Sequence, residues 1–278
     1  MKTSFNISIL GGRGYVGQEI IKIINNHPNF FISNIYSKSS QGKLVDDYNK
    51  SKSLTFKLLD SPDKLDFTDI DIVIMALSNN ESSDYIKSIE GHDPNIIIID
   101  ISADYRFDGG WAYKLPEIAT QTKDKRISNP GCYASAIQFS LFPIKHLING
   151  KVSCMGISGY SGAGATPNEK NDSNNLEGNI IPYSLSGHIH EKEVIRHCYE
   201  EISFSPHVAN FFRGILITSH IQLTKKSSSS EIYDLYKSFY NNKKLIKVIK
   251  EIPMINKVTE SHYVYLGGFE VDESGYGL

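Results

Sequence analysis

The first half of the chain alternates short apolar runs with helical patterns of polar and apolar residues. Two of the runs, residues 72–76 and 96–100, are almost continuously apolar, which is typical of strands buried on both faces of a parallel sheet. The other predicted elements are strands at 5–10 and 30–36 and helices at 15–26 and 81–90. This strand–helix–strand order predicts an α/β fold with a Rossmann-type doubly wound parallel sheet.

The pattern changes near residue 150, where the apolar positions alternate more and fewer helical patterns separate them. We predict strands at 152–157, 214–223 and 263–271, and a helix at 231–240 with a serine at its cap and a glutamate in its first turn. This half therefore reads as an α+β domain built on an antiparallel sheet. Because 278 residues exceed a comfortable single core, we expect two domains, 1–131 and 132–278.

Composition and charge narrow the function classes. The chain is 40% hydrophobic and 22% charged, with a formal net charge of −2 and both signs mixed along its length. The charges form neither a basic patch of the kind that binds nucleic acid nor a polybasic membrane anchor. The start of the sequence shows no signal-peptide pattern. Three widely spaced cysteines form neither a disulfide framework nor a CxxC pair. We therefore expect a cytoplasmic protein.

The first predicted strand runs directly into a GxGxxG pattern at Gly12, Gly14 and Gly17. A tight turn of this kind lets the backbone approach a pyrophosphate at the start of a helix. The predicted cofactor contacts here are Gly12, Arg13, Gly14, Tyr15 and Val16. Glycine-rich turns between a strand and a helix also occur for packing reasons alone, and this second interpretation stays open.

The end of the second predicted strand favours NADP over NAD. A site for NAD usually carries an acidic residue there to bind the ribose hydroxyls, whereas residues 36–43 contain no carboxylate. Ser37, Lys38 and Ser39 instead suit a 2′-phosphate. The alternative is a polar, solvated loop. Ser78 and Gly162 complete the predicted cofactor contacts; the latter lies in a glycine-rich stretch, 156–164, that does not match the GxSxG pattern of serine hydrolases.

A candidate nucleophile, Cys132, follows the chain-turning sequence Asn-Pro-Gly and precedes a helical pattern that runs from 133 towards 147. In the first turn of a helix, backbone N–H groups and the helix dipole favour a thiolate. The alternative for Cys132 is a small buried hydrophobic residue at a helix start. Cys154 lies within a strand pattern and fits a structural role, and Cys198 reads as a helix-face residue.

A thiolate nucleophile needs a partner for proton transfer. His188 and His190 lie in a turn that leads into a predicted helix, and Glu193 could orient one of the imidazoles. The sequence leaves open which histidine is the acid/base. A zinc site or plain surface polarity are the alternatives, and the metal interpretation is poor because neither HExxH nor a cysteine cluster accompanies the pair. Neither His207 nor His220 has neighbouring residues that indicate a role as the acid/base.

Two arginines are candidates for binding an anionic substrate. Arg106 follows the last strand of the predicted parallel sheet, on the edge where such sheets bind ligands, and Arg213 precedes a later strand. Guanidinium groups suit phosphate and carboxylate, although surface salt bridges are the alternative for each. The predicted substrate contacts are Ser102, Arg106, Asn129 and Arg213.

Taken together, these stretches resemble the N-acetyl-γ-glutamyl-phosphate reductases. The matching segments are GGRGYVG (11–17), SADYRF (102–107), LPE (115–117), SNPGCYASA (128–136), GISGYSGAG (156–164), HIHEKE (188–193) and PHVANFFRGI (206–215). The short segment between Arg106 and Leu115 is similar to the branch that includes the fungal reductase domains. The resemblance implies a Rossmann domain, a catalytic and dimerisation domain related to glyceraldehyde-3-phosphate dehydrogenase, NADPH as cofactor, and a homodimer or homotetramer.

The resemblance further implies the reduction of an acyl phosphate to a semialdehyde in arginine biosynthesis, with the family's nucleophile at Cys132 and its histidine at His188 or His190. Three alternatives remain: an aspartyl-phosphate reductase, an aminoadipyl-phosphate reductase served by a carrier, and an inactive NADP-binding homologue. The segments HIHEKE and SGYSGAG argue against an aspartyl-phosphate reductase. The mixed charge of the chain offers no basic docking surface for the carrier of an aminoadipyl-phosphate reductase.

The sequence departs from the family pattern at two points. Ser135 stands where the family usually carries threonine. After residues 267–271 the family continues with a further strand and a glycine- and glutamine-containing helix that packs on the nucleotide domain. The resemblance therefore predicts a chain that lacks the usual C-terminal strand and helix.

Overall fold

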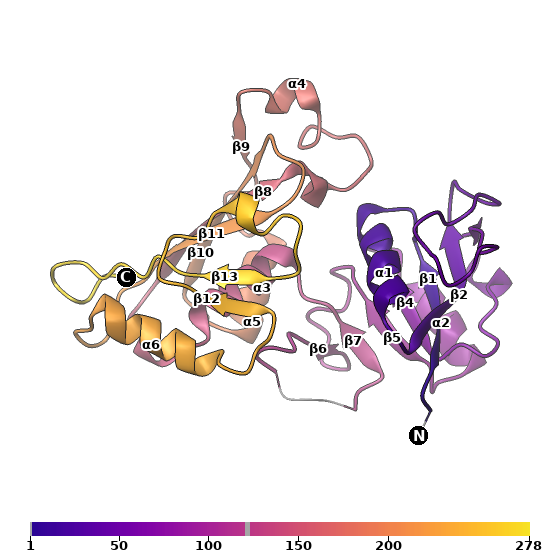
Figure 1. Ribbon diagram of the computed structural model, residues 1–278, viewed down its shortest axis with the longest axis horizontal. Helices are drawn as coiled ribbons and strands as arrows, with labels where there is room; N and C mark the ends of the chain where they lie inside the picture. The colour runs from indigo at the N-terminus through magenta and orange to yellow at the C-terminus, as the bar shows by residue number, and fades with distance from the viewer. Residues whose placement is uncertain (1, 120–122) are drawn as a thin grey trace. The chain divides into compact units, whose positions relative to one another are not determined.

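The computed structural model describes residues 2–119 and 123–278. The chain divides into two compact units (Figure 1). Unit 1 comprises Met1–Lys114 and Gln121–Pro130, and unit 2 comprises Leu115–Thr120 and Gly131–Leu278. Each unit has its own hydrophobic core, and Leu115 and Ile118 pack against the core of unit 2.

Unit 1 is built on a seven-stranded sheet in the order β3-β2-β1-β4-β5-β7-β6, and every pairing is parallel. Its elements are β1 (Phe5–Leu10), α1 (Tyr15–Asn26), β2 (Phe30–Ser37), β3 (Lys57–Leu58), β4 (Ile72–Met75), α2 (Ser83–His92), β5 (Ile97–Asp100), β6 (Ala112–Tyr113) and β7 (Arg126–Ser128). The strand order runs outward in both directions from β1 and β4, which places the topological switch point between them. The predicted Rossmann-type sheet is confirmed.

The apolar runs of these strands are buried on both faces of the sheet. Ile9 and Leu10 are neighbours in β1, both are fully buried, and they belong to different clusters of the core. Successive side chains of a strand point to opposite faces. A strand covered on both faces therefore needs apolar residues at consecutive positions, which explains the near-continuous runs in the sequence.

Unit 2 is built on a four-stranded sheet in the order β11-β8-β10-β9, with a separate pair β12-β13. Its elements are α3 (Cys132–Leu141), β8 (Val152–Gly159), α4 (Ser173–Leu176), β9 (Ile180–Pro182), α5 (Ile189–His197), β10 (Ile202–Ala209), β11 (Ile215–His220), α6 (Ser229–Phe239), β12 (Ile246–Val248) and β13 (Val264–Leu266). Short 3-10 turns occur at Pro62–Lys64, Lys145–Leu147, Tyr160–Ala163 and Ile255–Lys257. The prediction of a second, α+β unit is confirmed.

The sheet of unit 2 is mixed, so the predicted antiparallel arrangement is wrong in part. β8 pairs antiparallel with β11 but parallel with β10, and β12 pairs parallel with β13. The helix α5 lies between β8 and β10 in the chain and provides the crossover that a parallel pair requires. The sequence pattern does not reveal β10, because serines alternate with its first buried positions and Pro206 occupies the next buried one.

Several predicted bounds also change for local reasons. The helix predicted at 133–147 ends at Leu141, two residues before Pro143, which has no N–H to continue the helical hydrogen bonds. The strand predicted at 263–271 ends at Leu266, and Gly268 has a φ of +70° that leaves the extended conformation. The helix predicted at 81–90 is shifted to Ser83–His92.

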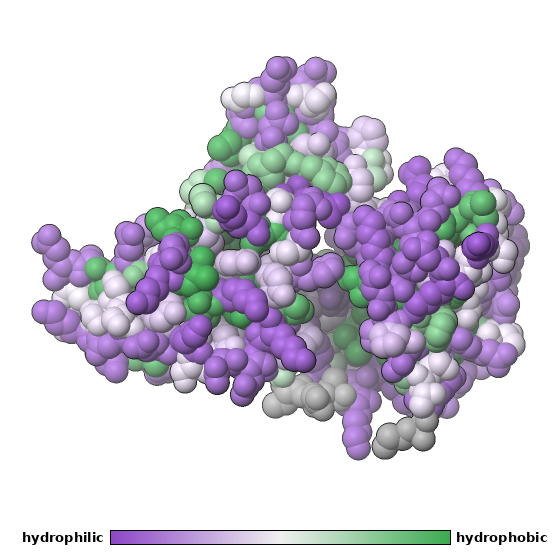
Figure 2. All heavy atoms as spheres, in the orientation of Figure 1, coloured by the Kyte–Doolittle hydropathy of each residue, from purple (hydrophilic) through white to green (hydrophobic). Residues whose placement is uncertain are grey.

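The surface is mostly polar. Figure 2 shows a face on which hydrophilic residues predominate and hydrophobic residues occur in small groups. Among residues 2–119 and 123–278, no helix is both long and apolar enough to cross a membrane. Within the same ranges, no three His, Cys, Asp or Glu side chains are grouped as metal ligands.

Candidate active site

The glycine-rich turn of unit 1 connects β1 to α1 at the switch point of the sheet. The N–H groups of Gly11 and Gly12 donate to the carbonyl of Tyr36 at 3.1 and 3.0 Å, which fixes the turn against the end of β2. The helix α1 then begins after Gly14, and no side chain caps it among the residues that the structure describes. Its first amides are in the position where a helix N-terminus binds a phosphate group.

Three glycines of this turn are required by close packing. A Cβ on Gly12 would lie 2.4 Å from the side chain of Ile35, and one on Gly17 would lie 2.6 Å from the backbone of Gly12. Gly11 has a φ of +85°, and a Cβ there would lie 2.2 Å from the carbonyl oxygen of Ala76. Sequence reasoning did not single out Gly11, although a glycine directly after a strand is the signal that marks it. By contrast, a Cβ on Gly14 would meet nothing closer than 3.7 Å.

The predicted contacts for the 2′-phosphate surround the ends of β2 and β4. Ser37 is buried at the end of β2, and its Oγ accepts from the N–H of Ser39 at 3.3 Å. Lys38 is exposed and forms an ion pair with Glu81 at 2.8 Å. Ser78 is exposed in the segment after β4. These positions lie at the carboxyl edge of the sheet, where doubly wound folds bind their ligands.

A buried carboxylate organises the same edge after β5. Asp100 is fully buried, and it accepts hydrogen bonds from the hydroxyls of Ser82 at 2.9 Å and Ser102 at 2.6 Å. Burial raises the pKa of Asp100, and the two hydroxyl groups oppose that rise. The carboxylate of Asp104 accepts from the N–H groups of Asn80 and Ser82. Ser102, predicted as a substrate contact, therefore faces Asp100. The roles of Asp100 and Asp104 were missed because Ser82 and Asn80 lie 18 and 24 positions before them in the sequence.

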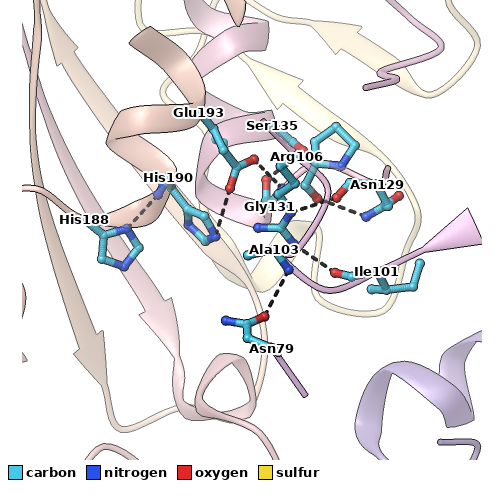
Figure 3. A network of polar contacts seen from close by, with 12 residues as sticks. Asn79, Ile101, Ala103, Arg106, Asn129, Gly131, Ser135, His188, His190 and Glu193 are labelled. Carbon is cyan, nitrogen blue, oxygen red and sulfur yellow. Dashed lines mark hydrogen bonds and ion pairs between the residues drawn. The ribbon is translucent and has the colours of Figure 1, made fainter. Parts of the chain in front are cut away.

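Arg106 is 8% exposed and holds the segment that leads to Cys132. Its Nε donates to the carbonyl of Asn129 at 3.0 Å, and its Nη2 donates to the carbonyl of Ile101 at 2.9 Å (Figure 3). The side chain of Asn129 donates to the carbonyl of Pro130 at 2.9 Å. Two predicted substrate contacts, Arg106 and Asn129, are thus placed together in unit 1.

In unit 2, Cys132 is the first residue of α3, with Gly131 as the N-cap. Its side chain is exposed, and no disulfide involves it. Burial raises the pKa of Cys154 to about 11 and that of Cys198 to about 12. Cys198 is the C-cap of α5 and does not lie on a helix face as predicted. Position and exposure therefore separate Cys132 from the other two thiols.

Glu193 connects the helix that carries the histidines to the start of α3. Its side chain is fully buried, and its Oε2 accepts from the N–H of Gly131 at 2.9 Å (Figure 3). Its Oε1 lies 3.8 Å from Nε2 of His190. A buried carboxylate is costly unless it is hydrogen-bonded or paired, and Glu193 has both kinds of contact.

The two histidines have different surroundings. His188 is the N-cap of α5, and its Nδ1 accepts from the N–H of His190 at 3.1 Å. Burial lowers the pKa of His188, the positive charge of Lys170 lowers it further, and Glu191 opposes both. The rings of His188 and His190 pack edge-on against Tyr133, the residue after Cys132, with centroids 6.5 and 6.0 Å away.

The remaining predicted residues of unit 2 lie on adjoining turns. Gly162 is exposed in the 3-10 turn after β8. The loop that carries Arg213 is fixed to this turn, because Tyr160 and Ser161 each donate a backbone hydrogen bond of 2.9 Å to residues 211 and 212. The guanidinium of Arg213 lies 5.1 Å from the centre of the Phe212 ring.

The two halves of the chain match two known families. Residues 6–125 match the semialdehyde dehydrogenase NAD binding domain, and residues 132–277 match the semialdehyde dehydrogenase dimerisation domain. Among solved structures, the aspartate semialdehyde dehydrogenase II of Vibrio cholerae covers 99% of this chain and 90% of its own, with a TM-score of 0.80 and 16% identity. At that identity the likeness shows the fold.

Proteins related in sequence share a higher identity with this chain than that solved structure does. The chain is 42% identical to Protein arg-6, mitochondrial, of Neurospora crassa over 97% of its length, but it spans only 32% of that protein, about a third. It is 36% identical to the N-acetyl-gamma-glutamyl-phosphate reductase of Stenotrophomonas maltophilia, over 98% of this chain and 87% of that protein. An identity of this size, over nearly the full length of both sequences, shows that the chain belongs to the N-acetyl-gamma-glutamyl-phosphate reductase family.

Proposed function

We propose that the chain reduces N-acetyl-L-glutamyl 5-phosphate to N-acetyl-L-glutamate 5-semialdehyde with NADPH and releases phosphate, as a step of arginine biosynthesis. The observation that carries this proposal is the placement of an exposed cysteine at the N-terminus of α3, next to a buried glutamate and two histidines. In this proposal residues 1–131 form the nucleotide domain and residues 132–278 form the catalytic domain.

The thiolate of Cys132 attacks the carbonyl carbon of the acyl phosphate, the carbon–oxygen bond to phosphate breaks, and a thioester remains. A thiolate is favoured there by the positive end of α3. The backbone N–H groups around the start of α3 stabilise the negative oxygen that forms on the carbonyl. Splitting the reaction in this way releases phosphate before the reduction, and the thioester then accepts hydride more readily than a carboxylate does.

The geometry favours His190 as the acid/base. The Nδ1 of His188 already accepts the capping hydrogen bond from the backbone, so this ring is neutral with its proton on Nε2. His190 instead has the carboxylate of Glu193 beside its Nε2, at 3.8 Å. Glu193 acts as a positioning residue.

The chain's own residues fit a dinucleotide. The turn at residues 11–17 is packed so closely that a Cβ at Gly12 or Gly17 would overlap its neighbours, and this brings backbone N–H groups to the switch point. We propose that Gly12, Arg13, Gly14, Tyr15 and Val16 bind the pyrophosphate, that Ser37, Lys38 and Ser39 bind the 2′-phosphate, and that Ser78 and Gly162 line the remaining site. When bound, NADPH supplies the hydride that reduces the thioester.

The substrate is a small anion, and its charges need cationic or amide partners. We propose Arg213 as a direct contact, because its loop is fixed to the turn after β8 and its side chain is half-buried. Arg106 donates to two backbone carbonyls, so in this proposal it also shapes the segment before Cys132. Ser102 and Asn129 belong to the same edge of unit 1 and complete the proposed contacts.

We also propose a homodimer or homotetramer that binds neither nucleic acid nor membrane. One face of the sheet in unit 2 packs against α3, and the other face presents the exposed side chains of Met155 and Thr218 on neighbouring strands. The match to a dimerisation domain supports a second copy on that face. Light scattering at micromolar concentration tests this, and a monomer would contradict it. We infer that the chain works in the cytoplasm, because Cys132 must stay reduced. The location of a fluorescent fusion in the cell tests this.

The activity is tested in the reverse direction, by following NADP⁺ reduction with N-acetylglutamate semialdehyde and inorganic phosphate. The proposal predicts turnover that requires phosphate and is abolished in Cys132→Ser. A Cys198→Ala variant is the matched control and should keep its activity, because that thiol is held protonated by burial. Absence of turnover in a folded chain that binds NADP⁺ would overturn the proposed function. Equal turnover with aspartate semialdehyde would overturn the proposed substrate.

A further inference from the structure

The loop between β8 and α4 is shaped by asparagine side chains that bond to its own backbone. Nδ2 of Asn168 donates to the carbonyl of Thr166 at 2.9 Å, and Nδ2 of Asn171 donates to the carbonyls of Gly164 and Thr166 at 2.9 and 2.8 Å. Oδ1 of Asn168 in turn accepts from the N–H of Lys170 at 3.0 Å. Local bonds of this kind give a loop a defined conformation without help from a helix or a sheet. The position of Lys170 is therefore fixed by its own loop.

Lys170 is held over an aromatic ring beside the histidines. Its Nζ lies 4.6 Å from the centre of the Tyr183 ring, and that ring lies 5.7 Å from the ring of His188. The charge of Lys170 acts on His188, where it lowers the pKa of the imidazole. Burial raises the pKa of Tyr183 to about 12, and the charge of Cys132 is the second cause. Lys170 thus lies over the ring of Tyr183, which packs against the ring of His188, and all three residues belong to unit 2.

The position of a cation relative to the nucleophile decides which anionic group it can bind. In an acyl phosphate, the phosphate is bonded to the same carbonyl carbon that Cys132 attacks. The carboxylate of an N-acylated amino acid lies several bonds away from that carbon. The rings of His188 and His190 pack against Tyr133, the residue after Cys132, with centroids 6.5 and 6.0 Å away. A cation that belongs to the same aromatic cluster is therefore placed for the phosphate.

We propose that Lys170 binds the phosphate group: the leaving group of the acyl phosphate, and inorganic phosphate in the reverse direction. This inference rests on the proposed function and adds a residue that sequence reasoning did not select. A lysine ammonium is a compact charge with three donors, which suits the rotating oxygens of a departing phosphate. The charge also stabilises the dianion that forms as the carbon–oxygen bond breaks and the thioester of Cys132 is made.

The test is the phosphate dependence of the reverse reaction in Lys170→Met, Lys170→Arg and a matched control. Lys192→Met is the control, because Lys192 is an exposed lysine on α5 in the same unit. We expect the KM for phosphate to rise by about tenfold or more in Lys170→Met, the size of effect expected when a charge-assisted hydrogen bond is lost. The KM values for the semialdehyde and for NADP⁺ should stay within about twofold. Lys170→Arg should recover most of the loss, and Lys192→Met should behave as the parent.

Three kinetic outcomes overturn the inference: an unchanged KM for phosphate in Lys170→Met, an equal change in Lys192→Met, or a rise in the KM for the semialdehyde alone. The last of these would assign Lys170 to the carboxylate. Thermal unfolding of each variant shows whether the fold is kept.

Phosphorus NMR separates this inference from the proposed function, because line broadening of inorganic phosphate by the protein needs no turnover. Broadening that is lost in Lys170→Met but kept in Lys192→Met would support a phosphate site at Lys170 even in a chain without reductase activity. Turnover without any effect of Lys170→Met on broadening or on KM would reject Lys170 while leaving the reductase in place. Absence of both turnover and broadening would reject both.

Discussion

The helices α1 and α3 begin in the same way but are held by different means. Each follows a glycine N-cap in extended conformation: Gly14 has φ −62° and ψ 162°, and Gly131 has φ −68° and ψ 151°. Neither helix carries an acidic residue in its first turn. The first turn of each helix therefore adds no negative charge of its own at the positive end of the helix dipole.

The turn before α1 is held by backbone packed on backbone, whereas the turn before α3 is held by side chains. At α1, a Cβ on Gly17 would lie only 2.6 Å from the backbone of Gly12. At α3, Glu193 accepts from the N–H of Gly131, and Oγ of Ser135 donates to its carbonyl at 2.9 Å. The first arrangement tolerates no Cβ at Gly11, Gly12 or Gly17. The second depends on a carboxylate 62 positions away. The turn before α1 is thus anchored by backbone hydrogen bonds to Tyr36, whereas the start of α3 is anchored by the side chain of Glu193.

The largest effect should come from breaking the support of α3 at Glu193. In Glu193→Ala the N–H of Gly131 loses its partner, which costs about 1–3 kcal/mol of stability, and kcat should fall by about 100-fold or more as the support of the acid/base is lost. Glu193→Gln keeps an acceptor for Gly131, so it should restore stability in urea unfolding but not kcat.

The pH dependence distinguishes positioning from a purely structural role. A positioning role predicts that the pH profile of kcat changes in Glu193→Gln although its unfolding in urea matches that of the parent. The exposed Glu200→Gln serves as the control. A Glu193→Gln variant with the parent's kcat and pH profile would show that the carboxylate has no part in catalysis.

An intermediate effect should come from adding one methyl group to the turn before α1. In Gly17→Ala the new Cβ would lie 2.6 Å from the backbone of Gly12, so helix or strand must move, at a cost of about 1–3 kcal/mol. NADPH affinity should fall with it. Gly14→Ala is the matched change, since its Cβ would meet nothing closer than 3.7 Å, and its stability should stay within about 0.5 kcal/mol of the parent. Equal stability of the two variants in urea would show that close packing does not hold this turn.

The smallest effect concerns the cap of α5 and depends on pH. The lowered pKa of His188 means that the unfolded chain binds the proton more readily. Its contribution to stability is therefore complete above the unfolded pKa of about 6.5 and declines as the pH falls below that value towards the lowered folded pKa. His188→Asn keeps a capping acceptor without a titrating group. Between pH 6.5 and 5, the melting temperature of the parent should fall more steeply than that of His188→Asn, and parallel curves would contradict this.

The comparison also explains which features could be predicted from the sequence. The strands of unit 1 and the glycine turn were predictable because their signals are local: consecutive apolar residues in buried strands, and glycines directly after a strand. Cys132 at a helix start was predictable for the same reason, from Asn-Pro-Gly before it and an apolar helical pattern after it.

Features that depend on distant pairing could not be predicted. β10 pairs parallel with β8, and neither its serines nor Pro206 indicates that pairing. The choice of acid/base between His188 and His190 depends on which ring accepts the backbone N–H and which ring lies beside Glu193. The sequence positions of the two histidines do not determine these contacts. Lys170 lies 18 positions before His188 by number, in a loop whose shape comes from asparagine bonds that no periodicity shows. Each of these needs three-dimensional contacts.

The most direct test of the thioester on Cys132 is a reaction without phosphate. The chain is mixed with N-acetylglutamate semialdehyde and NADP⁺, and absorbance of NADPH is followed together with the intact mass of the protein. We predict a burst of a single turnover and an N-acetylglutamyl adduct on the peptide that contains Cys132, both discharged when inorganic phosphate is added and both absent in Cys132→Ser. A burst without an adduct, or an adduct on Cys154 or Cys198, would contradict the account.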